Sequence, residues 1–354
     1  MNHLILLCRP GFEAECAAEI TDLAAEYGHY GYARTTCGSG WVAYVLQRAD
    51  GALDLVQQVP FSRLIFARQW FAAGAALAAL PASDRLTPLL AAAEGFPLCG
   101  ELRVESPDSA DAESLVVLCR KLTSPAAQLF RKAGCLSAKR TRRLPALHLL
   151  LVRADTAYVG VSPARNSSPH DRGIPRLRFP AAAPSRSTLK LEEALLYFLT
   201  EAERETLLQP GMRAVDLGAA PGGWTWQLAH RHLRVTAVDN GPMQPALMES
   251  GVVEHVRADG FRYQPPRPVD WMVCDMADSP LKVADRMAQW YAQGWCRQTV
   301  FNLKLPMKKR YQAVCDCRQR IEQRLQGCGR DYRLDFKQLY HDREEITGYL
   351  RPPA

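Results

Sequence analysis

Two lysines and two carboxylates in the C-terminal half are of the types needed to activate a hydroxyl group. Lys304 lies among two leucines and a proline, and Lys190, Asp275 and Glu345 are its possible partners. A lysine is a base only when it loses its proton near neutral pH, which burial and a second cation favour and carboxylates oppose. We therefore expect Lys304 to be the base, Lys190 its partner cation and Asp275 the positioning acid. Glu345 is expected to fix Lys190 or the substrate.

Two alternatives stay open for this catalytic set. The lysines could hold phosphates without any proton transfer. Glu344 and Glu345 are adjacent, and alternation along a strand places them on opposite faces, so only one of them serves. Glu345 is preferred because it adjoins the predicted strand.

A glycine-rich turn, Asp216-Leu-Gly-Ala-Ala-Pro-Gly-Gly-Trp, separates a predicted strand from a predicted helix. It differs from the dinucleotide fingerprint G-x-G-x-x-G, which binds pyrophosphate at the helix N-terminus. An acid at the strand end repels phosphate but suits a ligand with an ammonium group, such as S-adenosylmethionine. A turn without a ligand is the simpler alternative. The turn residues predicted to bind the cofactor are Asp216, Gly218, Ala220, Pro221, Gly222 and Gly223.

Further acids end the neighbouring predicted strands. Asp239 is placed to accept hydrogen bonds from a ribose diol, Asp259 to read an adenine amino group, and Asp275 to lie at the same edge. Ligands of open α/β sheets bind over the carboxyl ends of the strands. Each acid alone could equally be a helix cap or a solvated loop residue, but the succession favours one cofactor site.

The C-terminal half alternates predicted strands and helices, which indicates a mostly parallel sheet covered on both faces. Its last two strands have no helix between them and predict an antiparallel hairpin. The fold class is thus α/β, with a Rossmann-like domain. The predicted strands are 212–217, 234–239, 253–257, 271–274, 299–305, 332–340 and 346–350, and the predicted helices are 188–200, 224–231, 245–250, 281–295 and 309–326.

The N-terminal half has an α+β pattern that suggests two modules. A β-α-β-β unit covers 4–47, and a second unit begins with a predicted strand at 61–71. Residues 111–134 predict one long helix or two helices broken at Ser124-Pro125, because a residue before proline avoids the helical region. A hairpin at 147–161 closes this half. We expect domains at 1–58, 59–165 and 187–354, with a basic, proline-rich linker at 166–186.

Positive charge is concentrated around this linker. Residues 131–190 hold thirteen basic and two acidic side chains, a net charge of +11, whereas the whole chain carries +7, so the remainder sums to −4. A local imbalance of this size favours a polyanion partner over an ordinary solvated surface. The predicted RNA contacts are Arg140, Arg142, Arg143, Arg165, Arg172, Arg176 and Arg178.

The composition of the 354 residues is ordinary for a globular protein, with 47% hydrophobic and 23% charged residues. No stretch of about 20 apolar residues predicts a membrane span, and the N-terminus lacks a signal-peptide pattern. Eleven scattered cysteines without a C-x-x-C pair predict reduced thiols in a cytoplasmic protein and no metal site.

The turn from Asp216 and the Lys190, Asp275, Lys304 and Glu345 set resemble the FtsJ-like 2′-O-ribose RNA methyltransferases. More narrowly, the chain resembles the RlmM enzymes over nearly its whole length. The blocks that carry this resemblance are Cys8-Arg-Pro-Gly-Phe-Glu, Phe61-Ser-Arg-Leu-Ile-Phe-Ala-Arg-Gln-Trp, Pro184-Ser-Arg-Ser-Thr-Leu-Lys-Leu-Glu-Glu, Asp239-Asn-Gly-Pro-Met and Asn302-Leu-Lys-Leu-Pro-Met-Lys-Lys-Arg-Tyr.

The resemblance implies a ferredoxin-like domain, a THUMP domain that grips RNA and a Rossmann-like methyltransferase domain. It implies 2′-O-methylation of one cytidine in the peptidyl-transferase region of 23S rRNA, with S-adenosylmethionine as the methyl donor. It also implies a cytoplasmic monomer that acts before the large subunit is fully assembled, and a cofactor contact from Ser187.

Other functions remain as alternatives. A base methyltransferase is disfavoured because no Asn-Pro-Pro-Tyr-like tetrapeptide follows the strand that ends before Asp275, and Cys274 lies within that strand. A nicotinamide dehydrogenase would need a dinucleotide site. A non-catalytic RNA-binding assembly factor, or a 2′-O-methyltransferase of a different RNA, would leave the same sequence features.

Overall fold

The computed structural model describes residues 1–353, which form two compact units, Met1–Pro175 and Arg176–Ala354. Each unit is built on its own seven-stranded sheet. The division after Pro175 falls inside the predicted linker. The predicted domain boundaries at residues 58, 165 and 186 stay predictions.

The C-terminal unit confirms the predicted α/β, Rossmann-like fold. Its sheet has the order β10-β9-β8-β11-β12-β14-β13, with parallel pairs throughout except where β14 pairs antiparallel with β12 and β13. The strands are β8 (Arg213–Leu217), β9 (Arg234–Val238), β10 (Val253–Val256), β11 (Val269–Cys274), β12 (Cys296–Lys304), β13 (Arg333–Lys337) and β14 (Glu345–Arg351). The helices are α5 (Thr188–Phe198), α6 (Glu201–Leu207), α7 (Gly223–Ala229), α8 (Pro245–Met248), α9 (Pro280–Ala292) and α10 (Arg310–Leu325).

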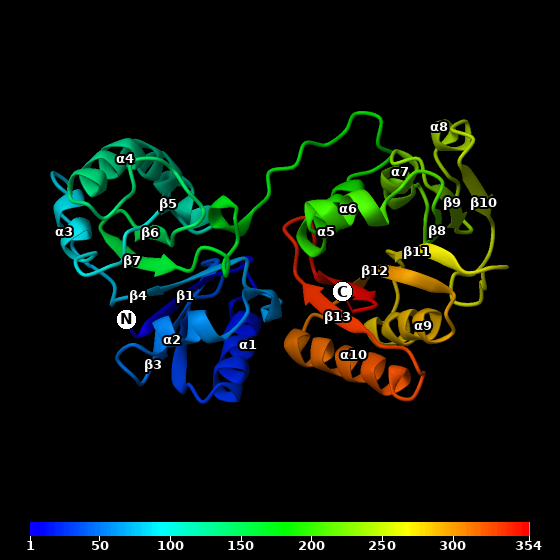
Figure 1. Cartoon of the computed structure of the whole chain (residues 1–354), viewed down its shortest axis with the longest axis horizontal. Coiled ribbons are helices and arrows are strands. Elements are labelled where there is room, and N and C mark those ends of the chain that lie inside the picture. The colour runs from blue at the N-terminus through cyan, green and yellow to red at the C-terminus, as the bar shows by residue number, and fades with distance from the viewer. Residues whose placement is uncertain (354) are drawn as a thin grey trace. The chain divides into compact units, whose positions relative to one another are not determined.

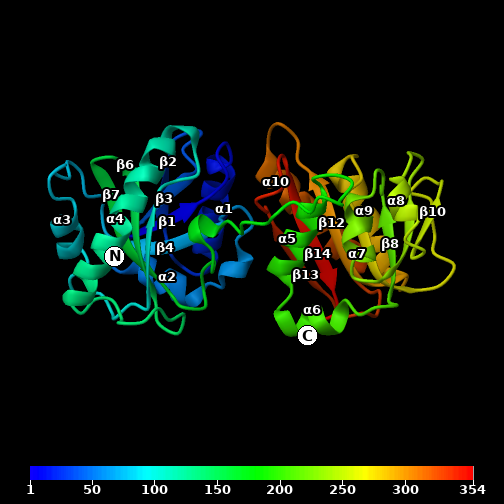
Figure 2. The same cartoon turned by 90° about the horizontal axis from the view of Figure 1, so that it is seen from above.

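Helices cover both faces of this sheet. Figure 1 shows α5 and α7 on one side of the strands and α9 and α10 on the other, and Figure 2 gives the same unit from above. Under α5 and α7, a core forms from alternate strand residues such as Ala214, Ala237, Trp271 and Val273. Because side chains alternate along a strand, the residues between them point to the side of the sheet on which α9 and α10 lie.

The N-terminal unit has the sheet order β2-β3-β1-β4-β7-β6-β5. Strand β4 pairs with both β1 and β7, so one continuous sheet joins the two predicted modules. The strands are β1 (His3–Leu7), β2 (Gly31–Thr35), β3 (Trp41–Leu46), β4 (Gln69–Ala73), β5 (Glu101–Glu105), β6 (Ala146–Arg153) and β7 (Thr156–Ser162). The helices are α1 (Glu13–Glu26), α2 (Gly51–Gln58), α3 (Leu86–Ala91) and α4 (Glu113–Lys132).

The predicted strand at 61–71 is mostly wrong. Only Gln69–Ala73 is a strand, and Phe61–Arg63 forms a 3-10 turn. The backbone N–H groups of Ile65 and Phe66 donate to the buried carboxylate of Glu19 instead of joining a strand ladder. The carboxylate of Glu19 therefore accepts the hydrogen bonds from backbone N–H groups that would otherwise have paired within a sheet.

Helix α4 continues through Pro125, so the alternative of one long helix is right. Pro125 is exposed, and the backbone carbonyl that its missing N–H leaves unpaired can be hydrated. Leu115, Cys119, Ala126 and Phe130 are buried along one stripe of the helix, and this packing offsets the local cost of the proline.

No helix within residues 1–353 combines the length and the apolar character that a membrane span requires.

Candidate active site

A crevice of about 400 Å³ lies over the carboxyl ends of β8, β9, β10 and β11. This is the edge at which ligands of open α/β sheets bind. Its lining residues are Gly218, Ala220, Val238, Asp239, Asn240, Ala258, Asp259, Gly260, Phe261, Asp275, Met276, Ala277 and Asp278. The crevice therefore includes five of the predicted cofactor residues: Gly218, Ala220, Asp239, Asp259 and Asp275.

Gly218 allows the turn after β8 to pass close to the segment after β11. Its φ is +77°, and a Cβ there would lie 2.7 Å from Cγ of Met276. A larger residue would both strain the backbone and displace Met276, which lines the crevice. The glycine thus shapes the crevice wall through a contact within the protein.

The other predicted turn residues lie beside the crevice lining. A Cβ on Gly223 would lie 2.1 Å from Oγ of Ser187, so helix α7 begins tightly against the segment that leads into α5. The Ser187 hydroxyl exchanges a hydrogen bond with that of Ser185 at 2.7 Å. Pro221 and Gly222 complete the turn before α7. None of these three predicted residues, Ser187, Pro221 or Gly222, belongs to the crevice lining.

Asp216 is buried just behind the crevice turn. Its Oδ2 accepts a hydrogen bond from the Thr225 hydroxyl at 2.6 Å, whereas its Oδ1 has no partner among the described residues. Burial, with the nearby charges of Asp275 and Asp239, raises the pKa of Asp216 to about 7. A ligand amino group that reached Oδ1 would satisfy this orphaned acceptor, so Asp216 fits the expected ammonium-bearing cofactor.

Asp239 and Asp259 both organise the backbone around the crevice. The Asp239 oxygens accept from Gly241 N at 2.7 Å and from Ala220 N at 3.0 Å, which fixes the turn after β8. Asp259 Oδ1 accepts from Phe261 N at 2.8 Å. A carboxylate has about four acceptor sites, so each retains capacity for a ligand donor.

The four predicted catalytic residues come together from four elements. Lys190 lies in the first turn of α5, Asp275 follows β11, Lys304 ends β12 and Glu345 begins β14. The antiparallel register of β12 and β14 places Lys304 opposite Glu345. Directly opposed strand residues point to the same face of a sheet, so the pairing brings the amine and the carboxylate together.

Each lysine of this quartet contacts both carboxylates. Lys304 Nζ donates to Asp275 Oδ1 at 2.6 Å and to Glu345 Oε2. Lys190 Nζ lies 3.3 Å from Asp275 Oδ2 and also pairs with Glu345 Oε1. The Lys304 side chain is 32% exposed and that of Lys190 16%, so Lys304 is the more accessible of the two to a substrate.

The quartet changes the expected protonation of Lys304. Burial alone would lower its pKa, but the charges of Asp275 and Glu345 outweigh burial and raise its pKa above the ordinary value. The apolar flanks that suggested a low pKa are therefore not decisive, because the paired carboxylates dominate. In this arrangement Lys304 carries its proton at neutral pH.

The two adjacent glutamates have different surroundings. Glu345 is 3% exposed and lies between the lysines. The Glu344 side chain points to solvent and pairs with Arg310 at 2.6 Å. Adjacent residues of an extended chain point to opposite sides, so one carboxylate lies among the lysines and the other lies in solvent.

A hydrogen-bonded chain behind Asp275 was not predicted from the sequence. Asn302 Nδ2 donates to Asp275 Oδ1 at 3.1 Å, and the Thr347 hydroxyl donates to Asn302 Oδ1 at 2.8 Å. Thr347 also lies 3.0 Å from an oxygen of Asp342, whose pKa burial raises well above its usual range. The Thr347 hydroxyl has one hydrogen, so it can donate to Asn302 and still bond to Asp342 only when Asp342 is protonated, which its raised pKa favours. Asn302 shares a face with Lys304 two residues on, and this alternation was the available signal.

Glu193 anchors the loop that carries Glu345. It lies one turn after Lys190 on α5 and accepts hydrogen bonds from the backbone N–H groups of Tyr340 and His341 at 2.8 and 2.9 Å. The His341 ring contacts the same carboxylate at 2.6 Å. Helix α5 therefore positions both Lys190 and, through this loop, Glu345. Nothing local in the sequence indicated this role.

The predicted RNA-binding arginines do not form one free group. Arg140 pairs with Glu101 at 2.8 Å, Arg142 lies 4.0 Å from the same carboxylate, and Arg172 lies 3.4 Å from Asp108. The other members, Arg143, Arg165, Arg176 and Arg178, make no ion pair within residues 1–353. Arg176 and Arg178 belong to the C-terminal unit and the remaining five to the N-terminal unit.

The geometry as a whole supports group transfer to a hydroxyl. The crevice offers acceptors for an amino group and a sugar, and the quartet at its edge offers cations and carboxylates around one accessible amine. Asp275 belongs to both, because it lines the crevice and pairs with both lysines. A substrate hydroxyl placed at Lys304 would thus adjoin the ligand in the crevice.

Three family models match consecutive parts of the chain. They are described as RlmM ferredoxin-like domain (residues 1–71), Ribosomal RNA large subunit methyltransferase M, N-terminal (residues 84–163), and FtsJ-like methyltransferase (residues 183–316). Together they span both units.

Full-length relatives agree with these matches. A protein of Cellvibrio japonicus named Ribosomal RNA large subunit methyltransferase M is 52% identical over 351 residues, covering 99% of each chain. A protein of the same name from Salmonella agona is 49% identical over 353 residues, covering 99% of this chain and 96% of its own. Among solved structures, TrmN from Thermus thermophilus covers 100% of both chains at 17% identity and a TM-score of 0.35.

Proposed function

The chain belongs to the ribosomal RNA large subunit methyltransferase M (RlmM) family, and from this premise we propose that it methylates the 2′-oxygen of one cytidine in 23S rRNA. It is a methyltransferase of large-subunit rRNA, and S-adenosylmethionine is its cofactor. The cytidine of the peptidyl-transferase region, the 2′-position and the base Lys304 are proposals. We further propose a cytoplasmic monomer that acts before subunit assembly is complete, with a THUMP module at 59–165.

S-adenosylmethionine supplies a methyl group on a positively charged sulfur. The residues that would hold it are Asp239 for its ribose and Asp259 for its adenine, which line the crevice, and Asp216, buried behind the crevice turn, for its amino group. Ser187 and the turn from Gly218 to Gly223 support this edge. The fit rests on the unpartnered Oδ1 of Asp216 and on the remaining acceptor capacity of Asp239.

The observation that carries the proposal is the quartet of two lysines and two carboxylates beside the crevice. A ribose hydroxyl is a weak nucleophile, and a positioned base contributes about 10²–10⁴-fold to such a reaction. Lys304 is the accessible amine, Asp275 and Glu345 fix its direction, and Lys190 balances their charge. Lys304 must lose its proton before it accepts one from the hydroxyl. A positive charge added to the crevice lowers the pKa of the Lys304 amine and so favours loss of its proton.

A clamped turn beside Lys304 supports RNA as the substrate. Leu305 N donates to the Glu344 carbonyl at 2.7 Å, and the Glu344 side chain pairs with Arg310. Between these two clamps Met307 is 92% exposed and is followed by two exposed lysines. An apolar side chain beside two cations suits a base next to its phosphates. We propose that this turn contacts the strand around the target nucleotide, and that Arg140, Arg142, Arg143, Arg165, Arg172, Arg176 and Arg178 contact RNA further away.

The test is methyl transfer to a transcript of the peptidyl-transferase region of 23S rRNA. The purified chain, S-adenosylmethionine and transcript should yield one 2′-O-methylcytidine in nuclease digests read by mass spectrometry. A matched transcript with a 2′-deoxycytidine at that position should accept no methyl group. A methyl group on a base, or on another nucleotide, would contradict the proposal. RNA binding without any transfer would instead favour a non-catalytic assembly factor.

A further inference from the structure

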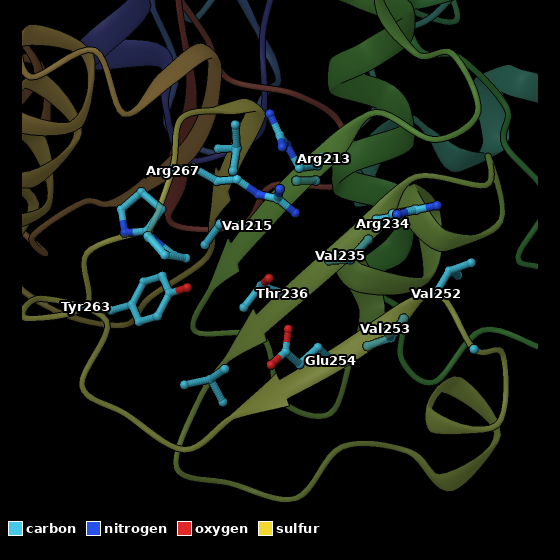
Figure 3. A pocket seen from close by; sticks show the side chains of 16 residues that line it. Arg213, Val215, Arg234, Val235, Thr236, Val252, Val253, Glu254, Tyr263 and Arg267 are labelled. Carbon is cyan, nitrogen blue, oxygen red and sulfur yellow. The ribbon is translucent and has the colours of Figure 1, made fainter.

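A groove on the C-terminal unit exists because one connection of the sheet lacks a helix. Residues 257–268 join β10 to β11 as turns and bends only, within the described chain. A cavity of about 520 Å³ remains over the starts of β8, β9 and β10, against the segment from Tyr263 to Val269 (Figure 3). Ala214 and Val235 face the core under α5 and α7, so their neighbours Arg213, Val215, Arg234 and Thr236 face the groove side. We call this cavity the arginine groove.

Three unpaired arginines line it. The side chains of Arg213, Arg234 and Arg267 make no ion pair or hydrogen bond within residues 1–353. Figure 3 shows Arg213 and Arg267 at one end of the groove and Arg234 at its flank. Guanidinium groups repel one another and offer five N–H donors each, which match phosphate oxygens in a two-pronged geometry. The arginine groove is therefore complementary to an anion.

The opposite end has a different chemistry. Tyr263, Thr236 and Glu254 lie there, and the Tyr263 hydroxyl points toward Thr236 in Figure 3. Their side-chain oxygens make no hydrogen bond within the described chain. Glu254 would repel a phosphate from this end but accepts hydrogen bonds from sugar hydroxyls and base amino groups. A ligand with one anionic end and one hydroxyl-bearing end matches both halves.

We propose that the arginine groove binds one nucleotide unit of the RNA substrate, with its phosphate at Arg213 and Arg267 and its sugar and base toward Glu254 and Tyr263. Its volume lies within the roughly 300–1,000 Å³ of ligand clefts. Arg213 begins β8 and Leu217 ends it, and a strand rises about 3.3 Å per residue, so the groove is roughly 13 Å from the catalytic edge. The bound unit is therefore not the methylated nucleotide. That the polyanion is RNA rests on the proposed function.

The test compares two arginine pairs of the same unit. Arg213→Ala with Arg267→Ala removes the phosphate end, and Arg297→Ala with Arg320→Ala removes two exposed arginines outside the groove. Binding of a transcript of the peptidyl-transferase region is measured by fluorescence anisotropy between about 50 and 200 mM salt. We expect the groove pair to weaken binding about tenfold, which corresponds to one lost charge-assisted contact. The slope of log affinity against log salt concentration should also fall by about one for each phosphate that is no longer bound. The control pair should change neither.

Further measurements separate the possible outcomes. Equal affinities and salt slopes for the two pairs would overturn the proposal. If the double alanine variant unfolds, Arg267→Ala alone, on the exposed connection, must still lower the salt slope. Ultraviolet cross-linking should join RNA to the peptide that contains Tyr263. Unchanged affinity for the free transcript, with lost affinity for partly assembled subunits, would assign the groove to a ribosomal protein. If the wild-type chain binds RNA through the groove but transfers no methyl group, the proposed function is refuted and the RNA site in the groove is still supported.

Discussion

Replacement of Lys304 by arginine tests whether a neutral amine takes the proton. The variant keeps a positive charge beside Asp275 and Glu345, but a guanidinium does not lose its proton in proteins. An ordinary lysine pKa of about 10.4 leaves about one neutral amine in a thousand at pH 7.4. The two carboxylates raise the pKa of Lys304 further and make that fraction smaller. A rate that depends on the neutral amine should therefore rise about tenfold per pH unit, or about a hundredfold from about pH 6.5 to 8.5.

The assay is single-turnover methyl transfer with saturating RNA and S-adenosylmethionine. The logarithm of the wild-type rate should rise with a slope near one. Lys304→Arg should lose this slope, and its rate should be about 10³-fold below that of the wild type at about pH 8.5. Lys190→Arg is the matched control, because it keeps the cation that balances the same carboxylates. It should retain the pH slope and lose less rate.

A flat profile would refute this reasoning, as would a Lys304→Arg rate within tenfold of the wild type. Either result would make Lys304 a fixed cation that holds the substrate. RNA affinity measured on the same variants separates the two roles, since a holding role moves Kd and a proton-transfer role moves only the rate.

Three further substitutions probe groups behind the quartet and the crevice. The pKa of Asp216 is about 7 in the folded chain and about 3.9 in the unfolded chain, so between these values the folded chain binds more protons and its stability falls as the pH rises. Asp216→Asn should remove up to about 4 kcal/mol of this loss of stability, measured from melting curves over pH, and should weaken S-adenosylmethionine binding. An unchanged dependence of stability on pH would contradict the assignment. Asp342→Asn should preserve unfolding free energy because an amide still donates to Thr347, whereas Asp342→Leu should lower it by about 1–3 kcal/mol; equal denaturation midpoints would rule out the chain. Glu193→Ala should lower kcat about tenfold with little change in cofactor Kd, because Glu345 loses its anchor; a matching loss of cofactor affinity would point to a general structural defect instead.

The sheet of the C-terminal unit could be predicted because its periodicity is local. Apolar runs of strand length, each followed by a helical pattern, predict parallel order, and the carboxyl ends of parallel strands meet at one edge. The acids Asp239, Asp259 and Asp275 therefore lie around one crevice, as their positions after strands suggested. The proximity of Lys304 and Glu345 does not follow from the predicted hairpin of β13 and β14, because it depends on the insertion of β14 between β12 and β13.

Contacts between distant segments could not be predicted in this way. The pKa of Lys304 is set by two carboxylates on other elements, which outweigh its apolar neighbours in the chain. The Glu19 carboxylate accepts hydrogen bonds from backbone N–H groups of a segment predicted as a strand. Glu101 forms an ion pair with Arg140, which belongs to the predicted basic surface. In each case a carboxylate decides the outcome, and its partner lies at least 29 residues away. Periodicity and local charge contain no information about such pairings.

The quartet bears on how a partly exposed lysine could be held in place and still act as the proposed base. Two amines and two carboxylates sum to zero charge, so the assembly is stable while each lysine keeps its proton. A positive charge added to the crevice lies beside Asp275, which is shared by the crevice and both lysines. That charge competes for the carboxylate and so weakens the attraction that raises the pKa of Lys304. Under the proposal that Lys304 is the base, the same contacts that raise its pKa in the free chain make its basicity depend on an occupied crevice.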